Sequence, residues 1–206
     1  MEAGVVSTLI AGLLLGIKHS FEPDHVIAVS TIASKSKSLF RSLLAGVCWG
    51  LGHSFVLFVV GLLAIILKFQ IPPEIESGFE IVVGMMLVYL GVNSLFAMSR
   101  RSGHLSLDNT NNKVYVKSVA IGGVHGLAGS AALTILVLST VDDFAVAALY
   151  ILVFGAGTII GMSSFTTALV IPIILGKMRL NIGKVMEFTT AVISLCFGGY
   201  YLYCHI

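Results

Sequence analysis

Two histidines and two carboxylates stand together in residues 18–25, between two segments that carry no charge. This octapeptide reads Lys-His-Ser-Phe-Glu-Pro-Asp-His, whereas residues 5–17 and 26–32 have no acidic or basic side chain. Ionisable side chains are costly at membrane depth, where they mark an ion pathway or a binding site. We therefore expect the fold to enclose this polar segment within apolar helices.

A break in the first helix is predicted at Pro23. On an unbroken helix, His19 and His25 would point about 120° apart around the axis, because six residues separate them at 3.6 residues per turn. Pro23 removes a backbone donor and disfavours helical geometry at Glu22. Proline at the first helical position, followed by Asp24, also favours a new helix start. Such a break would let His19, Asp24 and His25 converge on one ion.

The composition predicts a polytopic membrane protein. The 206 residues are 57% hydrophobic and 11% charged, and the mean hydropathy is +1.01, so a soluble domain of this size could not bury the apolar surface. The first apolar run lacks the basic start and small-residue cleavage site of a signal peptide. The net charge of +2 lies in short loops, so the lipid bilayer is the expected partner and nucleic acid is not.

Six apolar segments are expected to cross the membrane as α-helices. They are residues 4–33 (broken near Pro23), 40–68, 78–98, 117–139, 144–175 and 184–204. The first and fifth exceed the ~20 residues that a crossing needs, so a break or a tilt is expected in each. The distribution of Lys and Arg among the loops predicts a multi-pass plasma-membrane protein with both termini outside.

The two halves of the chain resemble each other. Three segments align at nearly the same offset: 16–19 with 122–125, 49–53 with 154–158, and Glu80 with Glu187. Each half contains three predicted spans, an odd number, so the halves would run in opposite senses through the bilayer. The predicted fold class is all-α, with residues 1–98 and 117–206 forming two inverted three-helix repeats and 99–116 a cytoplasmic linker.

Further polar residues lie within the predicted spans. His53 follows Gly52 and is interpreted either as a metal ligand or as a packed histidine bonded to a carbonyl. His125, the repeat partner of His19, is left open between a site residue and a structural one. The residues considered as lining the pathway or supporting the ligands are Glu22, Ser54, His125, Ser130 and Thr158.

The predicted ligand set combines imidazole and carboxylate groups without a thiolate. Imidazole suits nickel, cobalt, zinc and iron, whereas sets made of carboxylates and carbonyls suit magnesium, calcium or manganese. The set therefore favours a divalent transition ion without choosing among them. Cys48, Cys196 and Cys204 have no paired spacing and are interpreted as small hydrophobic residues. The ion would be a transported substrate, and no resident cofactor is predicted.

Two motifs resemble signatures of the nickel/cobalt transporter family. They are His19-x4-Asp24-His25 and residues 51–56, Leu-Gly-His-Ser-Phe-Val. The resemblance implies that His19, Asp24 and His25 bind the metal, that His53 assists, and that nickel is the first substrate and cobalt the second. Members of the family with eight spans carry an acidic third signature that is absent here. The chain looks more like the shorter branch of urease-accessory and nickel-transport membrane proteins, which implies a link to urease or other nickel enzymes.

The leading hypothesis is a permease that takes up this ion. Moving two charges inward is worth about 4.6 kcal/mol per 100 mV, twice the single-charge value, so the membrane potential alone suffices. One alternative is an exporter that exchanges metal for protons. Another is an intramembrane metal-dependent hydrolase or acyltransferase, but the sequence has no nucleophile motif and no soluble catalytic domain, so an enzyme is not predicted. The sequence does not specify an oligomeric state.

Overall fold

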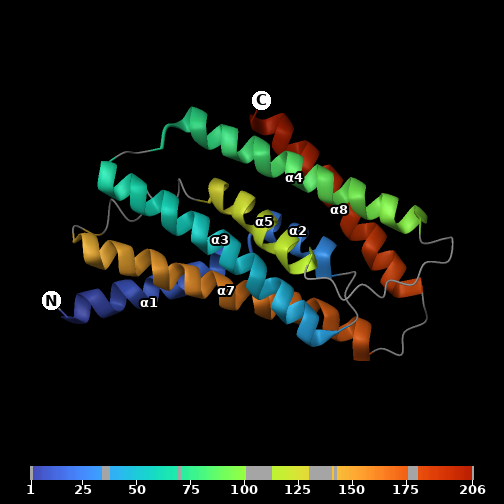
Figure 1. Ribbon diagram of the computed structural model, residues 1–206, viewed down its shortest axis with the longest axis horizontal. Helices are drawn as coiled ribbons and strands as arrows, with labels where there is room; N and C mark the ends of the chain where they lie inside the picture. Colours follow the sequence, from blue (N-terminus) through green and yellow to red (C-terminus); the bar gives the residue numbers. More distant parts are fainter. Residues whose placement is uncertain are drawn as a thin grey trace.

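The described part of the chain is all-helical, as predicted. The computed structural model describes residues 2–33, 38–68, 71–100, 113–129, 141, 143–175 and 181–205. The helices in these ranges are α1 (Glu2–His19), α2 (Pro23–Ala33), α3 (Leu39–Leu67), α4 (Pro73–Arg100), α5 (Lys113–Ala128), α7 (Phe144–Leu175) and α8 (Asn181–His205), drawn in Figure 1.

The helices are those of a membrane protein. Four of them (α3, α4, α7 and α8) are long and apolar enough to cross a bilayer, and the bent pair of α1 and α2 makes a fifth candidate span. The shorter apolar helix α5 has 16 residues. The predicted span 117–139 continues beyond α5 into residues 130–139, which lie outside the described residues. The count of six spans therefore stays a prediction.

The predicted break near Pro23 is confirmed. Helix α1 ends at His19 and α2 begins at Pro23, with a bend of 55° between them. The turn is closed by two bonds from a backbone N–H to the carbonyl three residues earlier, Phe21 to Lys18 and Glu22 to His19, both 3.0 Å. Because Pro23 has no N–H, the ladder of α1 cannot continue through it.

The break considered for the fifth span is wrong. Helix α7 runs without interruption through 32 residues. At 1.5 Å per residue it is ~48 Å long, well beyond the ~30 Å of the hydrocarbon core. It must therefore either tilt, which was the other expectation, or extend past the bilayer. No proline or charged residue interrupts its first 28 residues, so nothing local ends the helix.

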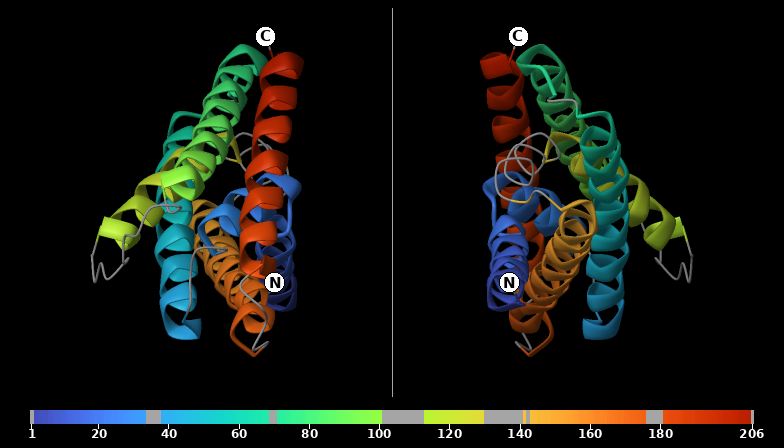
Figure 2. Two further views of the ribbon diagram at one scale, coloured as in Figure 1. Left: turned by 90° about the vertical axis from the view of Figure 1, so that its right-hand side faces the viewer. Right: turned by 90° about the vertical axis from the view of Figure 1, so that its left-hand side faces the viewer.

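Two pairs of helices pack in the same way and are joined by the contact of α3 with α7. Helix α3 packs against α5 and α7, α1 packs against α7, and α4 pairs with α8, as Figures 1 and 2 show from three sides. Glycines allow two of these contacts. A Cβ atom at Gly16 of α1 would collide with the carbonyl oxygen of Phe154 in α7, and one at Gly122 of α5 would collide with that of Trp49 in α3.

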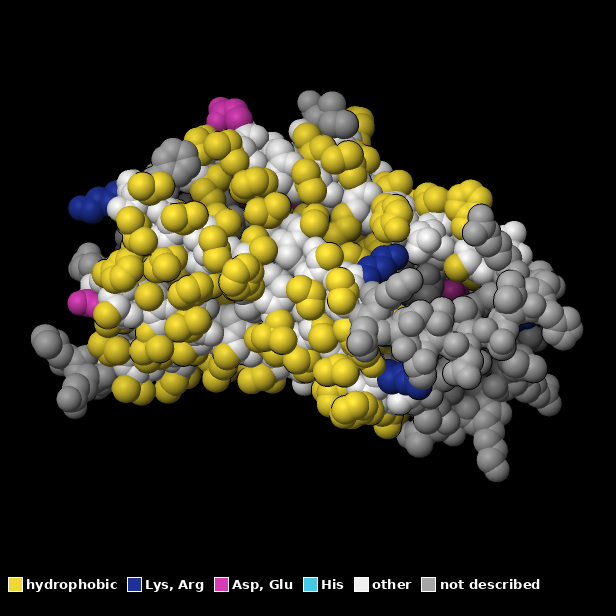
Figure 3. Space-filling view, in the orientation of Figure 1, with side chains coloured by type: hydrophobic (Ala, Val, Ile, Leu, Met, Phe, Trp, Pro, Cys, Tyr) yellow, Lys and Arg dark blue, Asp and Glu magenta, His cyan; other side chains and the backbone are white. Residues whose placement is uncertain are grey.

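The outer surface of this helix assembly is apolar while polar groups are buried inside it. Hydrophobic side chains cover most of the described part of the face in Figure 3, with few charged ones among them. Phe40 and Phe55 are 70% and 68% exposed. Such a surface is typical of helices in contact with lipid. Inside, α2 lies against α4, α7 and α8, and this position carries Asp24 and His25 into the interior.

Candidate metal site

The bend between α1 and α2 brings two histidine rings together. His19 is the last residue of α1 and His25 the third residue of α2. Their ring centroids lie 4.5 Å apart in an edge-to-face arrangement. The two rings would point in different directions on a continuous helix, so the break at Pro23 is what makes them neighbours, as the sequence predicted.

His53 joins these rings from α3. Its side chain is completely buried, and its Nε2 atom lies 3.2 Å from Nε2 of His19. The ring centroids of His53 and His25 are 5.0 Å apart. One ring nitrogen of each of the three histidines lies within 4.8 Å of the others. Three imidazoles at this spacing can converge on one transition ion.

His125 enters the same cluster from α5, in the other half of the chain. Its Nε2 atom is 2.7 Å from Oδ2 of Asp24, and the other oxygen of Asp24, Oδ1, is 3.0 Å from Nδ1 of His25. The rings of His25 and His125 are 4.0 Å apart. The sequence left His125 open between a site residue and a structural one, and the structure places it in the cluster. Its alignment with His19 was the signal for this.

The carboxylates fix which nitrogen of each ring is protonated. An ionised carboxylate only accepts hydrogen bonds, so His25 donates to Asp24 from Nδ1 and His125 donates from Nε2. The opposite nitrogens, Nε2 of His25 and Nδ1 of His125, are buried without a hydrogen-bond partner among the described residues. Glu22 Oε2 lies 2.9 Å from Nδ1 of His19. Glu22 and Asp24 thus bond to Nδ1 of His19 and of His25, which leaves Nε2 of these two rings as the nitrogen with the lone pair, an arrangement common among metal-binding histidines.

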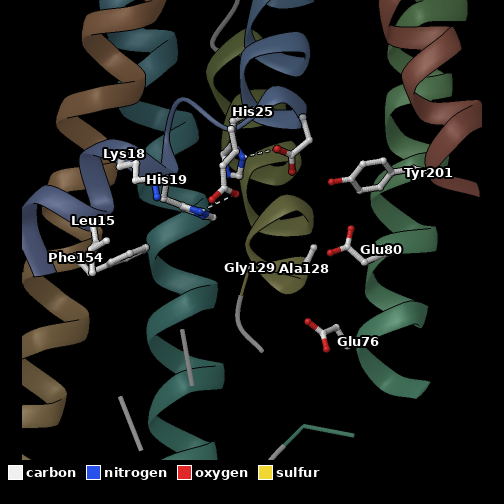
Figure 4. A pocket seen from close by; sticks show the side chains of 12 residues that line it. Leu15, Lys18, His19, His25, Glu76, Glu80, Ala128, Gly129, Phe154 and Tyr201 are labelled. Carbon is white, nitrogen blue, oxygen red and sulfur yellow. Dashed lines mark hydrogen bonds and ion pairs between the residues drawn. The ribbon is translucent and has the colours of Figure 1, made fainter. Parts of the chain in front are cut away.

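A pocket of about 240 Å³ opens beside the cluster. Its walls include His19 and His25 on one side and, across from them in Figure 4, Glu76 and Glu80 of α4 with Tyr201 of α8. The sequence did not single out Glu76 or Tyr201 and noted Glu80 only in the repeat alignment. The i, i+4 spacing of the two acids on α4 would have placed them on one face. Tyr201 had no comparable signal.

Comparison with known proteins places the chain in a family. It is 44% identical to the urease accessory protein UreH of Bacillus sp. (strain TB-90), over 98% of this chain and 93% of that protein. The chain belongs to the UreH family of urease accessory proteins. The predicted relation to the short urease-accessory branch is confirmed. No protein-family model matches the chain, so the wider resemblance to nickel/cobalt transporters stays a prediction.

Two plant proteins are more distant relatives of this UreH family member. They are Chloroplast proteins FOR GROWTH AND FERTILITY 1 and 2 of Arabidopsis thaliana, 26% and 27% identical over 80% and 81% of the chain. The chain spans about half the length of each, 50% and 48%. No solved structure matches.

Two residues considered as lining the pathway or supporting the ligands in this UreH family member make hydrogen bonds between helices. The hydroxyl of Ser54 in α3 donates to the carbonyl of Gly155 in α7, at 3.0 Å. The hydroxyl of Thr158 in α7 lies 3.0 Å from the carbonyl of Phe154, in its own helix, and 3.3 Å from that of Gly16 in α1. Neither is among the residues that line the pocket. Ser130 lies outside the described residues.

Proposed function

We propose that this protein is a membrane permease for a divalent transition-metal cation, with nickel as the first substrate and cobalt as the second. The observation that carries the proposal is the convergence of four imidazoles, three of them buried and that of His19 partly buried, with Asp24 among apolar helices. A nitrogen-rich set without thiolate suits such an ion. The relative is named a urease accessory protein, and urease is a nickel enzyme, so a supply of nickel fits that name. The same name supports a role that is not enzymatic.

In this proposal the ion is held by His19, His25 and His53, and Asp24 contributes through its bond to the His25 ring. The acids hold two of the three rings with a lone pair available, because Glu22 and Asp24 occupy their Nδ1 positions. The pocket gives the ion a way to the rings. Its wall contains four carboxylates, Glu22, Asp24, Glu76 and Glu80, against a single lysine, Lys18. A pocket lined by one sign of charge concentrates ions of the opposite sign.

The proposed architecture is a pair of inverted three-helix repeats with the site between them, as in many secondary transporters. The packing supports it. In the repeat alignment Gly16 corresponds to Gly122, and Phe154 to Trp49. The contact of Gly16 with Phe154 therefore has an equivalent in that of Gly122 with Trp49, and both are present. The pairing of α1 with α7 likewise has an equivalent in that of α5 with α3. The plasma membrane and a cytoplasmic linker at 99–116 belong to the same proposal. Labelling of Ser106→Cys in intact cells by an impermeant reagent would contradict this orientation.

Uptake down the membrane potential is the proposed direction, because about 4.6 kcal/mol per 100 mV favours entry of two charges, twice the single-charge value. The test is radioactive nickel flux into proteoliposomes that contain the full chain, with an inside-negative diffusion potential. Uptake should exceed that of protein-free vesicles and should fall when the potential is abolished. Vesicles with the wild-type protein that accumulate no more nickel than protein-free vesicles would refute the permease. Nickel efflux that strictly requires an inward proton gradient would instead indicate an exporter.

A further inference from the structure

We propose that Asp24, His25 and His125 form a second cation position, adjacent to the one formed by His19, His25 and His53, and that the ion passes between them through His25. This inference rests on the proposed function. It assigns a binding role to His125, and it gives Asp24 a role as a ligand in the second position in addition to its hold on the His25 ring.

The second position is a compact set of buried donor atoms. Asp24, His25 and His125 are 6%, 1% and 0% exposed, and one donor atom of each lies within 4.8 Å of the others. The carboxylate oxygens are 3.0 Å from Nδ1 of His25 and 2.7 Å from Nε2 of His125. The set draws its members from α2 and α5, so it spans the two halves of the chain.

His25 belongs to both positions because it has two ring nitrogens. Its Nδ1 atom faces Asp24, and its Nε2 atom has no partner among the described residues. Its ring centroid lies 4.5 Å from that of His19 and 4.0 Å from that of His125. An ion bound to Nε2 of His25 would therefore reach Asp24 and His125 by moving to Nδ1 of the same ring.

The transfer needs no net loss of protons from the rings. In the second position, His25 must carry its proton on Nε2 and His125 must carry its proton on Nδ1. Both of these nitrogens are without a partner among the described residues, so each can take the proton from the other nitrogen of its own ring. Both imidazoles stay neutral, and only their tautomers change.

Two adjacent positions with different donors would help the ion to leave. A channel or carrier site must bind well enough to admit the ion and weakly enough, or at enough positions, to release it. Three imidazole nitrogens form a strong site for nickel. Two nitrogens and a carboxylate, next to it and sharing His25, offer the ion a stepwise exit rather than the loss of all its ligands at once.

The test compares His125→Gln with His125→Ala in the full-length protein. A glutamine side chain retains an N–H donor for Asp24 but lacks the ring nitrogen that would bind the metal. We expect both variants to bind Ni²⁺ with nearly wild-type affinity in calorimetry, because the first position is intact. Both should lose at least about tenfold in nickel flux into proteoliposomes. If His125 only holds α5 to α2, His125→Gln will transport like the wild type, and the proposal is overturned.

A second measurement does not depend on variants at His125. In His53→Ala the first position loses a ligand, so anomalous scattering from nickel should lie among Asp24, His25 and His125. Nickel absent from that position under saturating metal would overturn the proposal. Failure of the permease itself looks different, because the wild type would then neither bind nor transport Ni²⁺. Wild-type transport together with wild-type behaviour of His125→Gln overturns the second position alone.

Discussion

Oδ2 of Asp24 lies 2.7 Å from Nε2 of His125, a residue that is 101 positions away in the chain. With Oδ1 on His25, the one carboxylate joins a histidine of its own helix to a histidine of the other half of the protein. This link makes the candidate site a product of both halves. It also makes Asp24 the residue whose replacement should disturb the most contacts.

Replacing Asp24 with asparagine should both destabilise the protein and weaken metal binding. An amide has one accepting oxygen and one donating nitrogen, so one of the two buried imidazole N–H groups would face another donor. An unsatisfied buried group costs ~1–3 kcal/mol, and loss of a group that orients a ligand lowers metal affinity about 10–100-fold. Thermal unfolding in detergent and nickel calorimetry measure the two effects. Glu76→Gln, across the pocket, is the control for stability. Equal unfolding temperatures for Asp24→Asn and the wild type would contradict this account.

Alanine variants of the three clustered histidines should separate by role. His19→Ala and His25→Ala are expected to abolish nickel uptake, because each removes a ring nitrogen that holds the ion. The carboxylate that bonds to that ring, Glu22 or Asp24, remains in place. His53→Ala should weaken affinity, by about 10–100-fold if His53 supports the other ligands and by more if it binds the ion directly. The matched control is His205→Ala, at the end of α8, where the ring contacts the backbone carbonyl of Tyr201. Wild-type nickel occupancy in His25→Ala would refute the assignment.

The close approach of α1 to α7 predicts a contrast between two glycines of one helix. A methyl group at Gly16 would collide with the carbonyl oxygen of Phe154, whereas nothing lies within 4 Å of a Cβ at Gly4. Gly16→Ala should lower stability by ~1–3 kcal/mol through overpacking. Gly4→Ala should be neutral or slightly stabilising, because alanine favours the helix. Unfolding midpoints in detergent compare the two, and equal midpoints would show that the helices do not approach this closely.

Local chemistry in the sequence predicted the part of the site that lies along one stretch of chain. Pro23 indicated the break, and the break brought His19 and His25 together. The contact of Asp24 with His125 could not be predicted in the same way, because it depends on how the other helices position α2 and α5, and no pattern in either helix specifies that. The same holds for Tyr201, which reaches the pocket only through the position of α8. Ser54 and Thr158 were chosen for their polarity, and in the structure their hydroxyls bond to backbone carbonyls, as buried hydroxyls often do.

The pH dependence of uptake provides a further prediction about the histidines. A ring nitrogen binds metal only through its lone pair, so protonation competes with the ion. Free imidazole titrates near 6.5. Each ring that must lose a proton to bind the ion costs about tenfold in apparent affinity per pH unit below the pKa of that ring. Lowering the external pH from about 7.5 to about 5.5 should therefore raise the half-saturating nickel concentration and leave the maximal rate less affected.

The measurement is nickel uptake into proteoliposomes with the same inside-negative diffusion potential at every external pH, so that the driving force on the ion stays constant. A half-saturating concentration that does not change over this range would contradict the expectation that a binding ring takes up a proton within it. The same vesicles, loaded with nickel, distinguish the direction of transport. Protons that enter a proton-coupled exporter would displace the metal and accelerate efflux when the outside is acidic. In an uptake permease, external protons compete with nickel for the histidines and supply no driving force, so acidification should slow entry without promoting efflux.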